Sequence, residues 1–150
     1  MKISLFLCLV IFSTTLCGEE LFRKFPAHQI KNEATFRDGT GRYEGSARRS
    51  GNTITYRDRT GRLAGTAVIN GDRITYRDGS GRYAGSEQIN GNSTTYRDRT
   101  GRLGGTSYTS NSQTTYRDGT GRYSGNSSSN GFRQTYRDRS GKLSGTAELR

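Results

Sequence analysis

The same short phrase returns every twenty residues along most of this chain. "TYRDRTGRLAGT" runs from Thr55 to Thr66, and the nearly identical "TYRDRTGRLGGT" runs from Thr95 to Thr106. Six copies fill residues 35–150 without an insertion. A fixed period of this length is typical of architectures in which each unit packs on its neighbours. We therefore expect one domain of six equivalent units over residues 35–150.

Four positions of the phrase hold the same kind of residue in every copy, and we interpret them as the structural framework of the repeat. They are the aromatic residues Phe36, Tyr56, Tyr76, Tyr96, Tyr116 and Tyr136, the aspartates Asp38, Asp58, Asp78, Asp98, Asp118 and Asp138, the glycines Gly41, Gly61, Gly81, Gly101, Gly121 and Gly141, and a second set of glycines at Gly45, Gly65, Gly85, Gly105, Gly125 and Gly145. Odd copies read "RDG" and "GRY", whereas even copies read "RDR" and "GRL" or "GKL". The duplicated unit is therefore predicted to be a forty-residue pair, present three times.

Each repeat predicts one β-hairpin. Asn-Gly at 70–71, 90–91 and 130–131 favours a type I′ turn, which needs a positive φ at both central residues. In the Asp-x-Ser/Thr-Gly segment, the aspartate is expected to cap the backbone of a second turn, and the glycine to adopt a left-handed conformation. The Thr- and Tyr-rich runs between these turns are typical of strands. The chain is thus predicted to be all-β, a meander of about twelve antiparallel strands.

The length of the Asp-x-Thr-Gly loop decides which side chains share a face. A four-residue loop places Tyr56 opposite Leu63 and Arg57 opposite Arg62, and it collects Ile54, Tyr56 and Leu63 on one apolar face. A three-residue loop with a bulge pairs Asp58 with Arg62 and separates Tyr56 from Leu63. The four-residue loop segregates apolar and polar residues better, so we expect that register.

An even number of strands allows the last strand to pair with the first, which would remove both exposed edges. We therefore expect a closed, pseudo-symmetric, shallow barrel or ring. The alternatives are an open twisted meander and a β-solenoid. Composition also supports a disordered chain, because only fifteen Leu, Ile, Val and Phe residues follow Cys17 and the net charge is +11.

The first 34 residues lie outside the repeat. Residues 1–17 combine Lys2, an apolar run and small residues near Cys17, which predicts a signal peptide and a secreted or periplasmic protein. A lipid anchor at Cys17 is the alternative. Residues 18–34 are expected to form an N-terminal linker or arm, with His28 exposed to solvent. The mature protein would then contain no cysteine and no transmembrane span.

No combination of residues predicts catalysis. An enzyme needs a singular constellation, whereas the polar residues here recur, and the single histidine, His28, lies outside the repeat. The "DGTG" segments differ from the Asp-Thr-Gly of aspartic proteases by one inserted residue. The six aspartates lack the density of a calcium-binding loop. We therefore predict no enzyme activity, no cofactor and no metal site.

The repeated cations are the candidate binding residues, because arginine forms bidentate contacts with phosphate, sulfate and carboxylate groups. They are Arg37, Arg42, Arg57, Arg62, Arg77, Arg82, Arg97, Arg102, Arg117, Arg122, Arg137 and Lys142. Two interpretations remain open: the neighbouring aspartates neutralise these cations internally, or an external polyanion does. The motif tyrosines likewise are either core residues or stacking platforms for sugar rings.

Tyr, Arg, Asp, two residues, Gly-Arg-Leu and a further Gly resemble the YD repeats of Rhs-type proteins, which build β-rich shells in secreted or surface proteins. The chain differs by an Arg between Tyr and Asp and by its short length. Six Gly-rich hairpins are also similar to β-flower proteins, which are shallow symmetric barrels, many with export signals. Both resemblances imply a β-repeat architecture of the kind found in exported proteins, and the lack of a singular constellation predicts a non-enzymatic protein. We expect it to bind a cell-envelope glycan, lipid headgroup or extracellular DNA, to bind carbohydrate, or to act as a scaffold.

Overall fold

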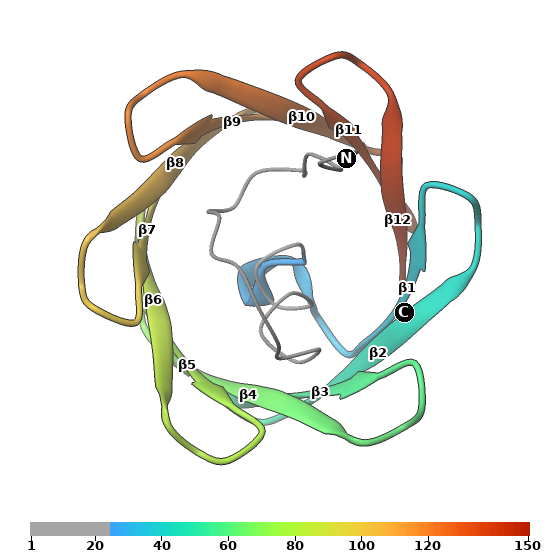
Figure 1. The fold of residues 1–150 in the computed structure, drawn as a ribbon, viewed down its shortest axis with the longest axis vertical. Coiled ribbons are helices and arrows are strands. Elements are labelled where there is room, and N and C mark those ends of the chain that lie inside the picture. Colours follow the sequence, from blue (N-terminus) through green and yellow to red (C-terminus); the bar gives the residue numbers. More distant parts are fainter. Residues whose placement is uncertain (1–24) are drawn as a thin grey trace, which may run out of the picture.

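The computed structural model describes residues 25–150 and shows a closed all-β barrel (Figure 1). Twelve antiparallel strands follow one another around the ring in sequence order, and β1 pairs with β12 to close it. The strands are β1 (Glu33–Asp38), β2 (Tyr43–Ser50), β3 (Thr53–Asp58), β4 (Leu63–Asn70), β5 (Arg73–Asp78), β6 (Tyr83–Asn90), β7 (Ser93–Asp98), β8 (Leu103–Ser110), β9 (Gln113–Asp118), β10 (Tyr123–Ser129), β11 (Arg133–Asp138) and β12 (Leu143–Leu149). The predicted closed barrel is confirmed, and the open meander, the solenoid and the disordered chain are wrong.

The two ends of the barrel carry different connections. At one end, which we call the loop end, six loops join each odd-numbered strand to the next strand and project outward around the ring (Figure 1). At the other end, the turn end, tight turns such as Gly51–Asn52 join β2, β4, β6, β8 and β10 each to the following strand. Because the chain is a meander, every copy of the Asp-x-Thr/Ser-Gly segment lies at the loop end.

The loop that contains Asp-x-Thr/Ser-Gly has three residues, one fewer than the four-residue loop that we expected from the sequence. The Asp58 N–H donates to the Arg62 carbonyl at 3.0 Å, and the Gly61 N–H donates to the Asp58 carbonyl at 3.0 Å. Gly61 has a φ of 82° and is therefore in the left-handed conformation. A three-residue hairpin loop has such a residue after its type I turn. The four-residue loop is therefore wrong, and Arg57 does not face Arg62.

A bulge follows the loop and restores the pattern on the inner face. Arg57 lies opposite Leu63 and Tyr56 lies opposite Gly65, so Ala64 is an extra residue in β4. Tyr56 and Ala64 are buried, whereas Leu63 points outward and is 47% exposed. The expected apolar face is therefore correct for Ile54 and Tyr56 and wrong for Leu63.

The tight turns also differ from the expectation. Gly71 is the first residue of its two-residue turn, with a φ of 58°, and Asn70 is the last residue of β4. Among residues 25–150, Asn111 is the one non-glycine with a positive φ, so Asp72 does not adopt one. Glycine at the first central position is the pattern of a type II′ turn, and the type I′ prediction is wrong here.

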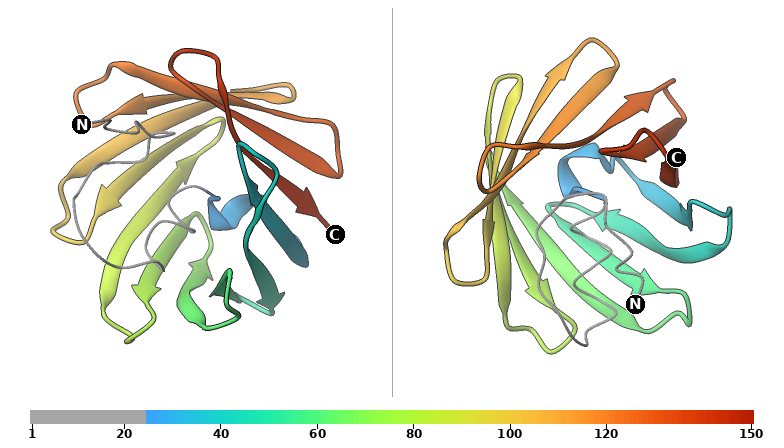
Figure 2. Two further views of the ribbon diagram at one scale, coloured as in Figure 1. Left: turned by 45° about the vertical axis from the view of Figure 1, so that its right-hand side comes forward. Right: turned by 45° about the horizontal axis from the view of Figure 1, so that its top comes forward.

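The strands are staggered, which inclines them to the barrel axis (Figure 2). Tyr56 lies opposite Gly65, and Gly65 lies opposite Asp78, which is two residues beyond the equivalent Tyr76. Each repeat therefore advances the register by two residues, and this stagger allows a sheet to close. A twelve-stranded barrel is wider than the eight-stranded size that its own side chains just fill.

The unrepeated segment fills part of that width. Residues 25–32, which we call the plug, lie inside the ring and contain the 3₁₀ helix η1 (Ala27–Gln29) (Figure 1). Phe25, Ala27 and Ile30 are buried in the core cluster. Part of the expected arm thus packs in the hydrophobic core, whereas Lys31 and Asn32 are exposed. The predicted signal peptide, with Cys8 and Cys17, lies outside the described residues.

Candidate anion-binding ring and barrel interior

Each loop is held by its own aspartate. One carboxylate oxygen of Asp58, Oδ1, accepts hydrogen bonds from the Thr60 N–H at 2.8 Å, the Thr60 hydroxyl at 2.7 Å and the Arg62 N–H at 3.1 Å. The hydroxyl bond from Thr60 is the main cause that lowers the pKa of Asp58 below its usual value of 3.8. The same three bonds recur at every motif aspartate, which supports their interpretation as turn caps. They are formed by Asp38, Asp78, Asp98, Asp118 and Asp138.

The first arginine of each repeat braces the same loop from the outer wall. Arg57 donates one guanidinium hydrogen bond to the Gly61 carbonyl at 2.9 Å. Equivalent bonds of 2.9–3.1 Å are made by Arg37, Arg77, Arg97, Arg117 and Arg137. A guanidinium has five N–H donors, so each of these side chains retains donors for a second partner.

The loop end concentrates positive charge in what we call the arginine ring. Three sets of positions contribute: the bracing arginines, the residue after each loop, and the loop residue of the even repeats. The members are Arg37, Arg57, Arg77, Arg97, Arg117 and Arg137; Arg42, Arg62, Arg82, Arg102, Arg122 and Lys142; and Arg59, Arg99 and Arg139. All are exposed except Arg37, which is half-buried. These fifteen cations share the loop end with six capping aspartates, and sequence reasoning missed the contribution of the third set.

The motif aromatic residues point into the barrel. Phe36, Tyr56, Tyr76, Tyr96, Tyr116 and Tyr136 are each at most 4% exposed, and burial raises the pKa of the five tyrosines. They are core residues, so they offer no surface platform for a sugar ring. The exposed tyrosines are Tyr43, Tyr83, Tyr123 and Tyr108.

The plug is bound to the wall through tyrosine hydroxyls and one buried carboxylate. The Tyr56 hydroxyl donates to the Phe25 carbonyl at 3.2 Å, and the Ala27 N–H donates to the Tyr76 hydroxyl at 2.8 Å. The Tyr76 hydroxyl in turn donates to the carboxylate of Glu87. The Phe25 ring stacks on the Phe36 ring, with centroids 4.1 Å apart.

His28 is part of this contact, and its expected solvation is wrong. Its Nδ1 lies 2.8 Å from Oε2 of Glu87, which is 1% exposed, because the plug enters the barrel. One feature of the sequence indicates that Glu87 needs a partner inside the barrel. Glu87 occupies an inward position that holds Ala or Ser in the other repeats, and a buried carboxylate needs a partner.

Among residues 25–150, no three His, Cys, Asp or Glu side chains lie together in a geometry that would hold a metal ion. Within the same residues, no helix has the length and apolar character needed to cross a membrane.

No protein-family model matches this chain, and no curated protein matches its sequence. The hairpin repeats and the closed barrel are features of the structure itself. The resemblance to YD repeats and to β-flower proteins stays a prediction.

Proposed function

We propose that this chain is an exported, non-enzymatic binding protein that holds an anionic polymer of the cell envelope on its arginine ring. The observation that carries the proposal is the placement of fifteen cations at one end of the barrel. The carboxylates interact electrostatically with the cation after the loop, as Asp58 does with Arg62, but six aspartates can neutralise at most six of the fifteen cations. A cationic surface of this kind attracts polyanions and retains them in a salt-dependent manner.

The spacing of the ring favours a polymer over a single small anion. Equivalent arginines of neighbouring repeats lie two strands apart and are staggered by two residues, which separates their backbones by roughly 10–14 Å. An extended glycan phosphate, a sulfated polysaccharide or a DNA strand crosses several such positions at once. Several weak contacts along one chain then act together, which raises the overall affinity. We also propose, from the resemblance to YD repeats and β-flower proteins, that the protein is exported.

Two triple variants with equal charge changes test the arginine ring. The first changes Arg62, Arg82 and Arg102 to Glu at the loop end and leaves the bracing arginines intact. The matched control changes Arg49, Arg73 and Arg133 to Glu near the turn end. We expect the loop-end variant to elute from heparin and from immobilised lipopolysaccharide at a clearly lower salt concentration than the control. Equal losses would show that net charge alone drives retention, and the protein would then be a scaffold.

A further inference from the structure

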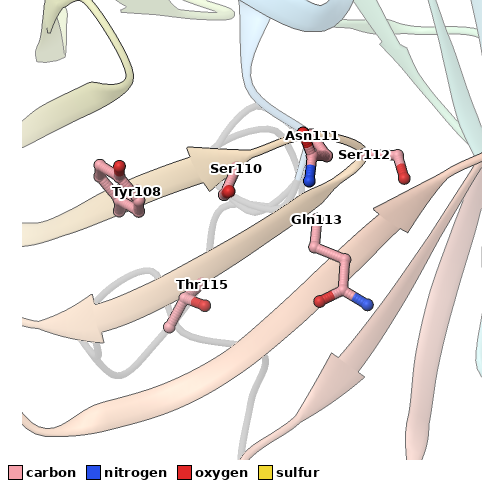
Figure 3. Close-up of a pocket in the computed structure, with 6 residues that line it drawn as sticks. All are labelled: Tyr108, Ser110, Asn111, Ser112, Gln113 and Thr115. Atoms are coloured by element: carbon pink, nitrogen blue, oxygen red, sulfur yellow. The ribbon is translucent and has the colours of Figure 1, made fainter.

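A pocket lies on the outer wall of the barrel, at the hairpin of β8 and β9. Its volume is about 310 Å³, and six side chains of β8, β9 and the turn between them line it (Figure 3). They are Tyr108, Ser110, Asn111, Ser112, Gln113 and Thr115. The volume is at the lower end of the range that small-molecule sites occupy. Every lining side chain is polar or aromatic and none is an acid or a base of the Asp, Glu, Lys, Arg or His type, although the protein as a whole is strongly basic.

Two of the lining residues, Tyr108 and Asn111, distinguish this hairpin from the others. Eight of the nine tyrosines occupy two repeated positions, whereas Tyr108 occupies neither. The equivalent positions in the other hairpins hold Arg48, Val68, Gln88, Ser128 and Glu148. Asn111 replaces the turn glycine found at Gly51, Gly71, Gly91 and Gly131, and it keeps a left-handed φ of 53°. An aromatic residue at a variable position and one replacement of the turn glycine thus meet at this pocket.

The geometry presents an aromatic ring beside a set of amides and hydroxyls. Tyr108 is 55% exposed and pairs with Thr115 across β8 and β9, while Ser110 pairs with Gln113 next to the turn. Thr115 is exposed, whereas the equivalent threonines of the other repeats are half-buried. The pocket is therefore open to solvent, with Tyr108 on β8 and the Asn111 and Gln113 amides nearer the turn (Figure 3).

We propose that this pocket binds one unit of a neutral oligosaccharide. A tyrosine ring offers an apolar face to the C–H face of a sugar, and its hydroxyl remains available for hydrogen bonding. The Asn111 and Gln113 amides and the Ser hydroxyls both donate and accept hydrogen bonds, as the hydroxyls of a sugar require. The site lies at the turn end, opposite the arginine ring, so it is independent of the proposed polyanion binding.

Backbone amide NMR spectra of the protein, titrated with cellotriose and with N,N′,N″-triacetylchitotriose, test this site. We expect at least one of the two sugars to shift the amide signals of residues 108–115, and the shifts to persist in about 1 M NaCl. Tyr108→Ala should weaken this binding about tenfold or more, since aromatic anchors dominate such contacts. The control Tyr83→Ala removes an exposed tyrosine outside the pocket and should leave the affinity unchanged.

Three results would overturn the proposal. They are the absence of shifts with both sugars at about 10 mM, shifts that Tyr108→Ala leaves intact, and binding that disappears in high salt. Tyr108 is largely exposed, so its alanine variant is expected to fold, and circular dichroism checks this. Loss of heparin retention in the loop-end variant, with sugar binding unchanged, would show that the two sites are separate.

Discussion

The two sides of the barrel interior are built from the same repeat and hold together differently. Two inward positions, which lie opposite each other in every hairpin, carry the difference. They hold Ile54 and Ala67 in the second repeat but Thr114 and Ser127 in the fifth, and all four residues are buried. The plug makes its ring stacking and most of its hydrogen bonds with repeats one, two, three and six, whereas repeats four and five carry hydroxyl groups at both positions.

The tyrosine hydroxyls follow this division. Tyr56 and Tyr76 form hydrogen bonds with the plug, and Tyr136 donates to Oε1 of Gln29 at 2.8 Å. Tyr96 and Tyr116 share hydrogen bonds of 3.1 Å and 3.0 Å with Ser107 and Ser127 of their own hairpins, and Tyr116 also interacts with the Gln29 side chain of the plug. The repeat therefore supplies an aromatic ring at a constant position, and the serine opposite Thr94 or Thr114 gives the tyrosine hydroxyl an additional partner in the wall.

The largest effect on stability is expected when a buried apolar residue beside the plug is replaced by the threonine that repeats four and five carry at the same position. Ile54→Thr removes buried apolar atoms beside the plug and introduces a hydroxyl there. We expect the free energy of unfolding to fall by about 2–4 kcal/mol. The reciprocal Thr114→Val should change it by less than about 1.5 kcal/mol. Urea denaturation followed by circular dichroism measures both values, and equal losses would contradict the division of the interior.

Removing a tyrosine hydroxyl should have a smaller effect, and one that depends on the side. Tyr76→Phe deprives the Ala27 N–H of its acceptor and the Glu87 carboxylate of a donor, both in the core, so we expect a loss of about 1–3 kcal/mol. Tyr96→Phe affects only the hydrogen bond with Ser107 and should cost about 0.5–1.5 kcal/mol. Hydrogen exchange of the plug amides should accelerate in the first variant alone. Faster exchange in both would show that the two tyrosines are equivalent.

Acid should weaken both sides alike, because the capping loops recur in every repeat. Hydrogen bonds from Thr60 and Thr120 lower the pKa values of Asp58 and Asp118 below 3.8 in the folded protein. The stabilisation from these carboxylates is complete above the unfolded value and is lost as the pH falls through the lower folded values. We expect the urea midpoint to decline below about pH 4, and Asp58→Asn and Asp118→Asn to reduce this decline equally. A larger effect for Asp58→Asn would link the loops to the plug.

Much of the architecture is predictable from the sequence because the same turn and strand signals recur in all six repeats. The period, the turn residues and the even strand count predict hairpins, strands and closure. The register at the loop cannot be predicted from the sequence, because the Asp-x-Thr-Gly segment is compatible with both a three-residue and a four-residue loop. Segregation of apolar residues favoured the wrong register because the bulge at Ala64 allows Tyr56 and Leu63 to face opposite sides.

The plug was unpredictable for a different reason. Nothing repeats in residues 25–32, so no pattern assigns them a position, and Phe25 and Ile30 alone do not indicate what they pack against. The arginine ring follows directly from the motif, since a meander brings all six loops to one end. The pocket at Tyr108 could not be predicted from the sequence. The residues that line it come together only when β8 pairs with β9.

The loop glycines of the odd repeats limit how this barrel can change in size. A Cβ added to Gly79 would lie 2.7 Å from the Leu63 carbonyl oxygen of the preceding repeat, and one added to Gly39 would lie 2.4 Å from that of Leu143. The seam that closes the ring is thus the same Gly-to-Leu joint that recurs within it. Inserting or deleting a single repeat would bring two odd or two even repeats together and break the alternation. A barrel that keeps this alternation therefore changes in size by whole forty-residue pairs, so its bore widens in discrete steps of four strands.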